Sequence, residues 1–458
     1  MTLVRTASPR LVPLAWPLFL ELLLGIGVGV AGTLLAARIS DTAGAAFALA
    51  NHVAATLFLL FRVIGAGVGV VLAHNLGAGQ RVAADAVARA ALGASSWIGG
   101  LTALAAFLAA APLLRLMNAP PEVLPLALPL LQVLAPTLLL DAWNASMGSV
   151  MRAHLRAREA LAVTVVMHGS LLLLCVPLMA GWGPTQALGI PALGLPGFAV
   201  ALLLSRSLGL ALHLWLWRRQ LGVVPQAADW WRLRRRELAA VAHIGLPGAA
   251  ENIIYRLAFM VSVAVAGTLG ARALATQAYA MQIVHLVLLF GLATGLSVET
   301  VVGHLIGAGR LHEAQRLVKR TLSLGLVVSV AVATAAALAG PWLLSGFTKD
   351  AEIVAAAVTL LWWTVLLEPG RIFNLIVVNG LRAAGDARYP VVAGALSMVV
   401  VLAGGSWFFG LHLGWGLPGV WLAYAADEWL RGLLMWRRWA QQKWVPHARA
   451  SRRRLARR

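Results

Sequence analysis

Twelve long apolar runs determine what this chain of 458 residues can fold into. Each run reaches or exceeds the ~20 residues that a helix needs to cross the hydrocarbon core of a bilayer. None shows the strict alternation over ~10 residues that is typical of a transmembrane β-strand, so helices are the remaining way to satisfy the backbone in lipid. The composition agrees, because only 12% of the residues are charged, against roughly 25% in soluble domains. We therefore predict an all-α polytopic membrane protein.

The polar breaks between the runs place the twelve predicted helices. They cover residues 11–37, 46–74, 86–111, 124–145, 159–180, 194–217, 243–267, 278–303, 316–340, 353–379, 389–411 and 416–438.

The cations lie on one side of this arrangement. Alternate segments, including both termini, hold 28 of the 37 Lys and Arg residues, whereas the opposite loops hold four. By the positive-inside rule both termini are cytoplasmic. The net charge of +20 then reflects topology and contact with membrane lipid, and binding of nucleic acid is not expected. An arginine-rich, lysine-poor chain indicates the plasma membrane of a bacterium, its inner membrane.

The two halves of the chain repeat each other. A shift of 230 residues, without a gap, places Pro17 on Pro247, Glu21 on Glu251 and His74 on His304. The same shift aligns Gly77–Gly79 with Gly307–Gly309, Asn144 with Asn374 and Arg152 with Arg382, and after a small change in length Gly194–Gly197 aligns with Gly416–Gly419. Six helices return the chain to its starting side, so the repeats are parallel, an arrangement that suits alternating access.

The repeat predicts four parts of the chain. Residues 1–222 form an N-terminal six-helix lobe, residues 223–242 a cytoplasmic linker, residues 243–440 a C-terminal six-helix lobe and residues 441–458 a basic cytoplasmic tail.

Three motifs resemble those of the multidrug and toxic compound extrusion (MATE) family, in its DinF-like bacterial branch. They are the Pro-x-x-x-Glu near the start of each half, the glycine turn after the second helix of each half (Leu76–Gln80 and Ile306–Arg310), and the segment Leu381–Asp386. The resemblance covers nearly the whole chain. It implies a twelve-helix exporter that exchanges a cytoplasmic organic solute for Na⁺ or H⁺.

The chain departs from that family at two places. Where many members carry an Asp in the middle of the first helix, this chain has Gly32, and Ser262 is at the matching second-half position. An acidic residue eleven positions before the Leu-Arg arginine is matched by Asp141 in the first half but by Arg371 in the second. The Na⁺ pattern is therefore broken, and we expect H⁺ as the coupling ion, with Na⁺ as the alternative and no other cofactor.

Ionisable side chains within the predicted spans are the candidate functional residues, because each costs at least ~2.5–3.5 kcal/mol near the bilayer centre. The acids are Glu21, Asp141, Glu251, Glu299, Glu368, Asp427 and Glu428, and the arginines are Arg62, Arg206, Arg256, Arg371 and Arg431. Glu368 with Arg371, and Asp427 with Arg431, share helix faces, which favours structural ion pairs.

Glu21 and Glu251 are the leading candidates for ion coupling. Neither has a cation within a helical turn, and the repeat places them symmetrically, one in the first helix of each lobe. We expect them to face each other across a cavity, where proton release and substrate binding are linked. Structural pairing with arginines such as Arg62 or Arg256 is the alternative.

Further candidates have lower rank. The coupling set is completed by Glu299, Asp141 and Glu368, and Glu299 is asymmetric because the repeat places Gly69 opposite it. Residues expected to line the cavity are Asn51, His52, Arg62, Arg256, Gln282, His285 and Arg371. For the Asn and His residues, a hydrogen bond to a neighbouring helix is an equally good interpretation. No catalytic residue or metal site is predicted.

We interpret the chain as a monomeric secondary active antiporter, not an enzyme, that exports cationic or amphipathic organic solutes. An exporter or flippase of an anionic metabolite or a lipid-linked substrate is the alternative, since arginines lie within the spans. An intramembrane enzyme would need a nucleophile, metal or phosphate-binding constellation, and a channel or passive scaffold would not need symmetric buried glutamates.

The cation count generates a prediction of topology. Single cysteines in residues 152–158, 218–236 and the tail, in a background where Cys175 is replaced, should resist an impermeant thiol reagent added to intact cells. They should react after permeabilisation. Labelling of all three segments from outside intact cells would contradict the topology.

Overall fold

Twelve long helical segments are present, at the positions that the sequence predicts. The computed structural model describes residues 10–117, 119–181 and 191–456, and these contain no β-strand. The long segments are α1 (Val12–Ala37), α2 (Asp41–Gly77), α3 (Arg81–Leu108), α5 (Leu124–Ala153), α6 (Ala157–Ala180), α8 (Leu195–Leu216), α9 (Arg235–Thr268), α10 (Ala271–Gly307), α11 (Leu311–Leu338), α13 (Ala351–Ala383), Arg388–His412 and α16 (Gly416–Ala440). The predicted fold class is confirmed.

Ten helices of the described chain are long and apolar enough to cross a membrane, and α2 and α16 are the other two long helices. Short helices connect or follow them: α4 (Ala110–Leu116), α12 (Gly340–Ser345) and α17 (Val445–Ala456). The segment Arg388–His412 is built from α14 (Arg388–Ser397), a π-helical turn η3 (Met398–Gly404), α15 (Gly405–Trp407) and a second π-helical turn η4 (Phe408–His412).

The chain divides into two compact units. The C-terminal unit contains Leu246–Arg458 together with Met1–Phe19 and Ala73–Gly79, and the N-terminal unit contains Leu20–Leu72 and Gln80–Gly245.

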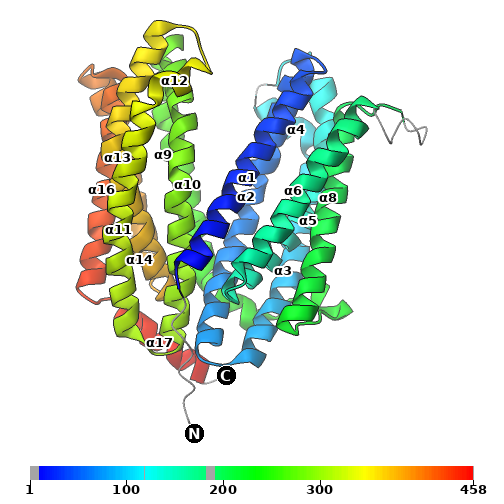
Figure 1. Ribbon diagram of the computed structural model, residues 1–458, viewed down its shortest axis with the longest axis vertical. Helices are drawn as coiled ribbons and strands as arrows, with labels where there is room; N and C mark the ends of the chain where they lie inside the picture. The colour runs from blue at the N-terminus through cyan, green and yellow to red at the C-terminus, as the bar shows by residue number, and fades with distance from the viewer. Residues whose placement is uncertain (1–9, 118, 182–190, 457–458) are drawn as a thin grey trace. The chain divides into compact units, whose positions relative to one another are not determined.

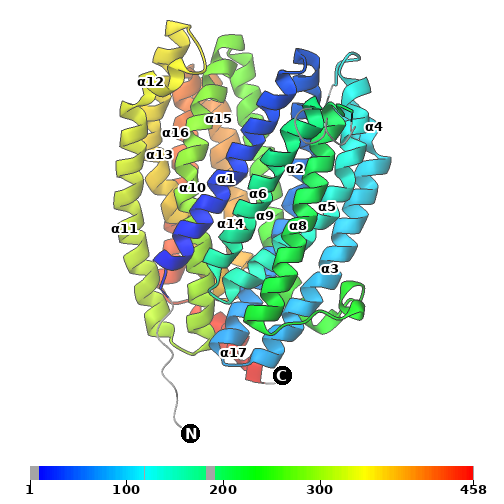
Figure 2. The ribbon, with the colours of Figure 1, turned by 45° about the vertical axis from the view of Figure 1, so that its right-hand side comes forward.

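In the C-terminal unit, α13 is the central helix. It packs against α10, α11 and α16, and Figures 1 and 2 show these helices running alongside one another. Its apolar core includes Met281, Leu360 and Trp421, and the Trp421 indole donates a hydrogen bond to Thr364 at 3.1 Å. Since α13 also carries Glu368 and Arg371, the central position of this helix buries both charges.

In the N-terminal unit, α5 has the corresponding central place. It packs against α3, α6 and α8. The core at one end is formed by Phe47, Leu131 and Phe198 among others, and the rings of Phe47 and Phe198 meet edge to face at 4.6 Å. The two central helices α5 and α13 are equivalent in the repeat, so both units bury the same region of sequence.

The repeated glycine turns end α2 and α10. Gly79 and Gly309 have φ angles of 76° and 77°, a region that favours glycine. Within the C-terminal unit the two helix ends cross closely: a Cβ on Gly77 would lie 2.1 Å from the His304 carbonyl oxygen, and a Cβ on Gly307 would lie 2.1 Å from that of His74. The motif therefore combines a helix stop with a close backbone contact.

The segment before α9 packs against the N-terminal unit. It contains η1 (Trp217–Leu221) and η2 (Ala227–Trp230). Asp229 is 1% exposed and lies 2.6 Å from Arg234, and the Trp97 indole donates to the Trp231 carbonyl at 2.9 Å. This part of the predicted linker is thus held in place by a buried charge and aromatic side chains.

The helix α17 belongs to the C-terminal unit and lies beside the end of α10. Trp444 stacks on Trp439 with ring centroids 4.4 Å apart. The next contacts are made at the two glycine turns, where Ser451 lies against Gly385 and Arg452 against Gly309. One face of the basic tail is therefore docked on the protein.

Candidate functional site

Two interhelical ion pairs lie inside the N-terminal unit. Glu21 of α1 meets Arg152 at the end of α5, with 3.0 Å between the carboxylate and guanidinium. Asp141 of α5 meets Arg206 of α8 at 2.7 Å. All four side chains are a quarter exposed or less. Each carboxylate in this set therefore has its own guanidinium.

The C-terminal unit repeats the first of these pairs. Glu251 of α9 meets Arg382 at the end of α13 at 2.5 Å. The shift of 230 residues that places Glu21 on Glu251 also places Arg152 on Arg382. The two leading candidates thus have arginine partners. These partners are different from the Arg62 and Arg256 considered from the sequence: the Arg256 side chain is exposed, and that of Arg62 lies outside the described residues.

Glu299 breaks the symmetry. It lies in α10, is 6% exposed, and interacts electrostatically with Arg382. Its Oε1 atom is buried without a hydrogen-bond partner among the described residues. At the equivalent place in the N-terminal unit, Gly69 lies beside Ser149. Arg382 is therefore shared by two carboxylates, whereas Arg152 is paired with Glu21.

A second charge cluster joins α13 to α16. Arg371 bonds Glu368 at 2.5 Å and lies 3.5 Å from Glu428. Arg431 lies 2.6 Å from Asp427 and 2.9 Å from Glu428. The two ion pairs predicted from helical spacing are confirmed, and Glu428 joins them into one network. Three carboxylates and two guanidiniums are buried together.

The two units carry opposite charges at one equivalent pair of positions. The alignment that places Asp141 on Arg371 was found from the sequence, and the shift that aligns Gly194 with Gly416 places Arg206 on Glu428. The structure pairs Asp141 with Arg206 and Arg371 with Glu428. The acid is thus on the fifth long segment of one repeat and on the sixth of the other. The loss of the second-half acid at position 371 is matched by an acid gained on the facing helix.

The repeated asparagines support this equivalence. The Asn144 amide donates to the Arg206 carbonyl at 3.0 Å, and the Asn374 amide donates to the Glu428 carboxylate at 2.9 Å. Each asparagine lies about one helical turn beyond the swapped residue.

The first-helix position that is acidic in many MATE proteins is filled differently in each unit. A Cβ on Gly32 would lie 2.7 Å from the Phe47 ring, so aromatic side chains occupy the space of a carboxylate. Ser262 is fully buried and hydrogen-bonds Tyr424, which also accepts from Gln277 at 2.9 Å. Neither position supplies a carboxylate.

The other expected cavity residues are on the surfaces of α2 and α10. His52, Gln282 and His285 are exposed and Asn51 is half-buried. His285 interacts electrostatically with Arg371, so it lies near the second cluster. The roles of these four residues in a cavity stay predictions. In the described part of the chain, no three His, Cys, Asp or Glu side chains converge in a way that could hold a metal ion.

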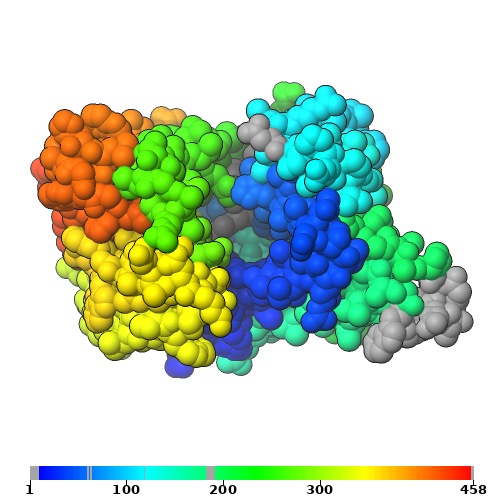
Figure 3. Space-filling model, turned by 90° about the horizontal axis from the view of Figure 1, so that it is seen from above, coloured from blue at the N-terminus to red at the C-terminus, as the bar shows by residue number. Residues whose placement is uncertain are grey.

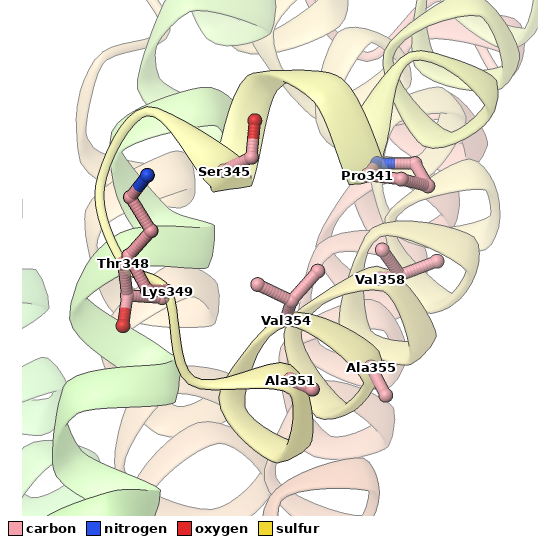
Figure 4. Close-up of a pocket in the computed structure, with 8 residues that line it drawn as sticks. All are labelled: Pro341, Ser345, Thr348, Lys349, Ala351, Val354, Ala355 and Val358. Carbon is pink, nitrogen blue, oxygen red and sulfur yellow. The ribbon is translucent and has the colours of Figure 1, made fainter.

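A surface pocket of about 620 Å³ lies elsewhere in the C-terminal unit. It is lined by Pro341, Ser345, Thr348, Lys349, Ala351, Val354, Ala355 and Val358. Figure 4 shows Val354 directed into the opening, between Pro341 and Lys349. The pocket belongs to the end of this unit that carries α12, the yellow region seen from above in Figure 3. It includes none of the buried charges.

Comparison with known families identifies the repeat directly. The MatE family model matches residues 17–178 and 247–407, so it matches each half once. Among curated proteins, the uncharacterized transporter YisQ of Bacillus subtilis is 31% identical over 94% of both chains. A probable multidrug resistance protein NorM of Rhizobium meliloti is 26% identical over 90% of this chain and 89% of its own.

Solved structures agree in fold. A crystal structure of a MATE protein in the bent conformation superposes with a TM-score of 0.86 at 20% identity, over 97% of each chain. An outward-facing multidrug resistance MATE family transporter gives a TM-score of 0.84 at 20% identity, over 97% of each chain.

The swapped pair generates a prediction about stability. Asp141→Arg or Arg206→Glu alone leaves two like charges buried in contact, and each should cost about 3–5 kcal/mol in the free energy of unfolding. The double variant D141R/R206E reproduces the order found at Arg371 and Glu428 and should recover most of that loss. Thermal unfolding of the purified protein in detergent measures the recovery.

The exposed pair Arg156–Glu159, with 2.9 Å between its charges, provides the control. Because surface pairs contribute about 0–1 kcal/mol, exchanging these two residues should change stability little. A D141R/R206E double variant no more stable than the single variants would show that the sign at each helix is fixed.

Proposed function

Because the chain belongs to the MATE family of transporters, we propose that it is a secondary active antiporter that exports organic cations in exchange for protons. The proton is carried by the carboxylates of the C-terminal unit. Glu299 and Glu251, which share Arg382, form the exchange site.

The observation that carries this proposal is the second carboxylate on Arg382. One guanidinium neutralises one carboxylate, so the group of Glu251, Glu299 and Arg382 has one negative charge in excess when all three are ionised. An uncompensated charge buried in a bilayer protein is costly. A proton on one of the two carboxyls removes that charge.

The charge balance of the two units points to the same place. Within the membrane helices, the buried ion pairs of the N-terminal unit comprise two carboxylates and two guanidiniums. In the C-terminal unit the two clusters contain five carboxylates and three guanidiniums among the described residues. Excess acid, and with it the capacity to take up protons, is thus a property of the C-terminal unit.

The arginines favour a proton over a sodium ion. Every carboxylate of the two clusters interacts with at least one guanidinium. A metal cation placed between them would be repelled by these fixed positive charges. A proton bound to an oxygen makes the carboxyl neutral and leaves the arginine with its other partner.

The shared arginine suggests how exchange works. When Glu251 is ionised it holds Arg382, and Glu299 can bind the proton. A substrate cation that approaches either carboxylate stabilises its ionised form and expels the proton. Binding of proton and substrate is therefore mutually exclusive, and reciprocal linkage requires substrate affinity to rise with pH.

This proposal predicts a specific loss in Glu299→Gln. Glutamine keeps the volume of the side chain but cannot titrate, so the pH dependence of substrate affinity, typically about 5–150-fold in coupled systems, should flatten. Efflux of ethidium driven by a pH gradient in proteoliposomes should fall by about the same range. Both are measured per amount of correctly folded protein.

Glu21→Gln is the matched control, because Glu21 is the repeat equivalent of Glu251 in a unit with balanced charge. It should retain pH-dependent binding and proton-driven efflux. Loss of coupling in Glu21→Gln together with normal coupling in Glu299→Gln would overturn the assignment. Efflux driven by a Na⁺ gradient but not by a pH gradient would replace the ion, and transport of anionic but not cationic probes would favour the alternative substrate class.

A further inference from the structure

A stripe along α11 changes from cationic to apolar. Arg316, Lys319, Arg320 and Ser323 are spaced by three or four residues, and the same spacing continues to Leu324 and Val327. Residues at this spacing lie on one face of a helix. The cationic part lines a groove of about 740 Å³, together with Leu305, Glu313 and Leu317.

The three cations of the stripe have no carboxylate partner. Glu313, the acid in the groove, is already held by Arg310 through two hydrogen bonds of 2.6 Å. None of Arg316, Lys319 and Arg320 forms an ion pair with another described residue. Helix α17 adds Arg452 close by, against Gly309 at the turn that leads into α11. The groove is therefore strongly positive and lacks an internal counterion.

The apolar part of the stripe is unusually exposed. Leu324 and Val327 are 62% and 68% exposed in the protein, and both lie within a helix long and apolar enough to span the membrane. The cations lie in the first three turns of this helix and the apolar residues in the turns that follow. A ligand that fits the whole stripe is anionic at one end and hydrocarbon at the other.

We propose that this stripe, here called the α11 lipid site, binds an anionic phospholipid of the phosphatidylglycerol type. The phosphodiester lies on Arg316, Lys319 and Arg320, and an acyl chain follows Leu324 and Val327. Basic pockets at the ends of membrane helices are suited to such headgroups. The proposal is independent of the substrate and the coupling ion.

The apolar continuation selects a lipid over a soluble phosphate. Inorganic phosphate or glycerol 3-phosphate can use the three cations but gains nothing from Leu324 and Val327. A phospholipid uses both, and its chain is held at the depth where α11 is apolar.

The test compares charge removal at the site with equal charge removal elsewhere. The full-length protein, purified in detergent, is titrated with dioleoylphosphatidylglycerol or dioleoylphosphatidylcholine, and bound lipid is measured by native mass spectrometry and by the increase in melting temperature. The site variant is R316Q/K319Q/R320Q, and the matched control is R218Q/R219Q/R232Q.

The parent protein should bind phosphatidylglycerol at least about tenfold more tightly than phosphatidylcholine. A cation near an anionic headgroup contributes about fivefold in affinity, so the site variant should lose up to about 100-fold for phosphatidylglycerol and none for phosphatidylcholine. The control should keep the preference. Leu324→Ala with Val327→Ala should weaken phosphatidylglycerol binding while leaving any phosphate binding unchanged.

Three results would overturn the proposal. The first is equal affinity of the parent protein for both lipids, and the second is an equal loss in the site and control variants. The third is full displacement of phosphatidylglycerol by millimolar glycerol 3-phosphate, which would identify a soluble anion as the ligand. Melting temperature in phosphatidylcholine alone shows that each variant is folded.

Discussion

The arginine–carboxylate pair is the interaction on which the interior of this protein depends. A single charge within a membrane helix is costly, and removing one partner of a buried pair leaves the other uncompensated. Glu21 with Arg152, Asp141 with Arg206 and Glu251 with Arg382 each join two helices that are far apart in sequence. Since each pair fixes two helices at a defined contact, the same groups that carry charge also set the packing of α5 and α13 in their units.

The repeat shows which aspect of these pairs is constrained. The end-of-helix pairs with Arg152 and Arg382 are the same in both halves, but the pair between α5 and α8 has the opposite order from the pair between α13 and α16. Neutrality at the contact is kept while the sign on each helix is exchanged. Additional acids were then placed only in the C-terminal unit, at Glu299 and in the cluster around Arg431. Unequal charge in two similar units gives them different capacities to bind protons.

Much of the fold could be predicted from the sequence. The apolar runs located all twelve long segments, although several helices extend beyond the predicted spans; α9, for example, begins at Arg235 rather than near residue 243. The reason is that helical hydrogen bonding continues past the apolar core into the polar interface. The ion pairs within a helix, Glu368 with Arg371 and Asp427 with Arg431, followed from spacing alone.

The pairs between helices were harder to predict, because sequence separation says nothing about which helices touch. A signal was nevertheless present: Glu21 and Arg152 both have counterparts at the same shift, and so the two acids and two arginines repeat together. The packed segment around Asp229 and Trp231 was also missed, since a polar, proline-containing stretch resembles a free linker. Only the tertiary contact with Trp97 shows that it is held.

The central claim is that an excess carboxyl of the C-terminal unit holds a proton in the resting protein. Infrared difference spectroscopy of the purified protein in lipid measures this directly, because a protonated carboxyl has a carbonyl band distinct from that of a carboxylate. We predict such a band at neutral pH, its loss when a substrate cation is added, and its absence in Glu299→Gln. A parent protein without a protonated carboxyl band, or a band that Glu299→Gln leaves unchanged, would contradict the account.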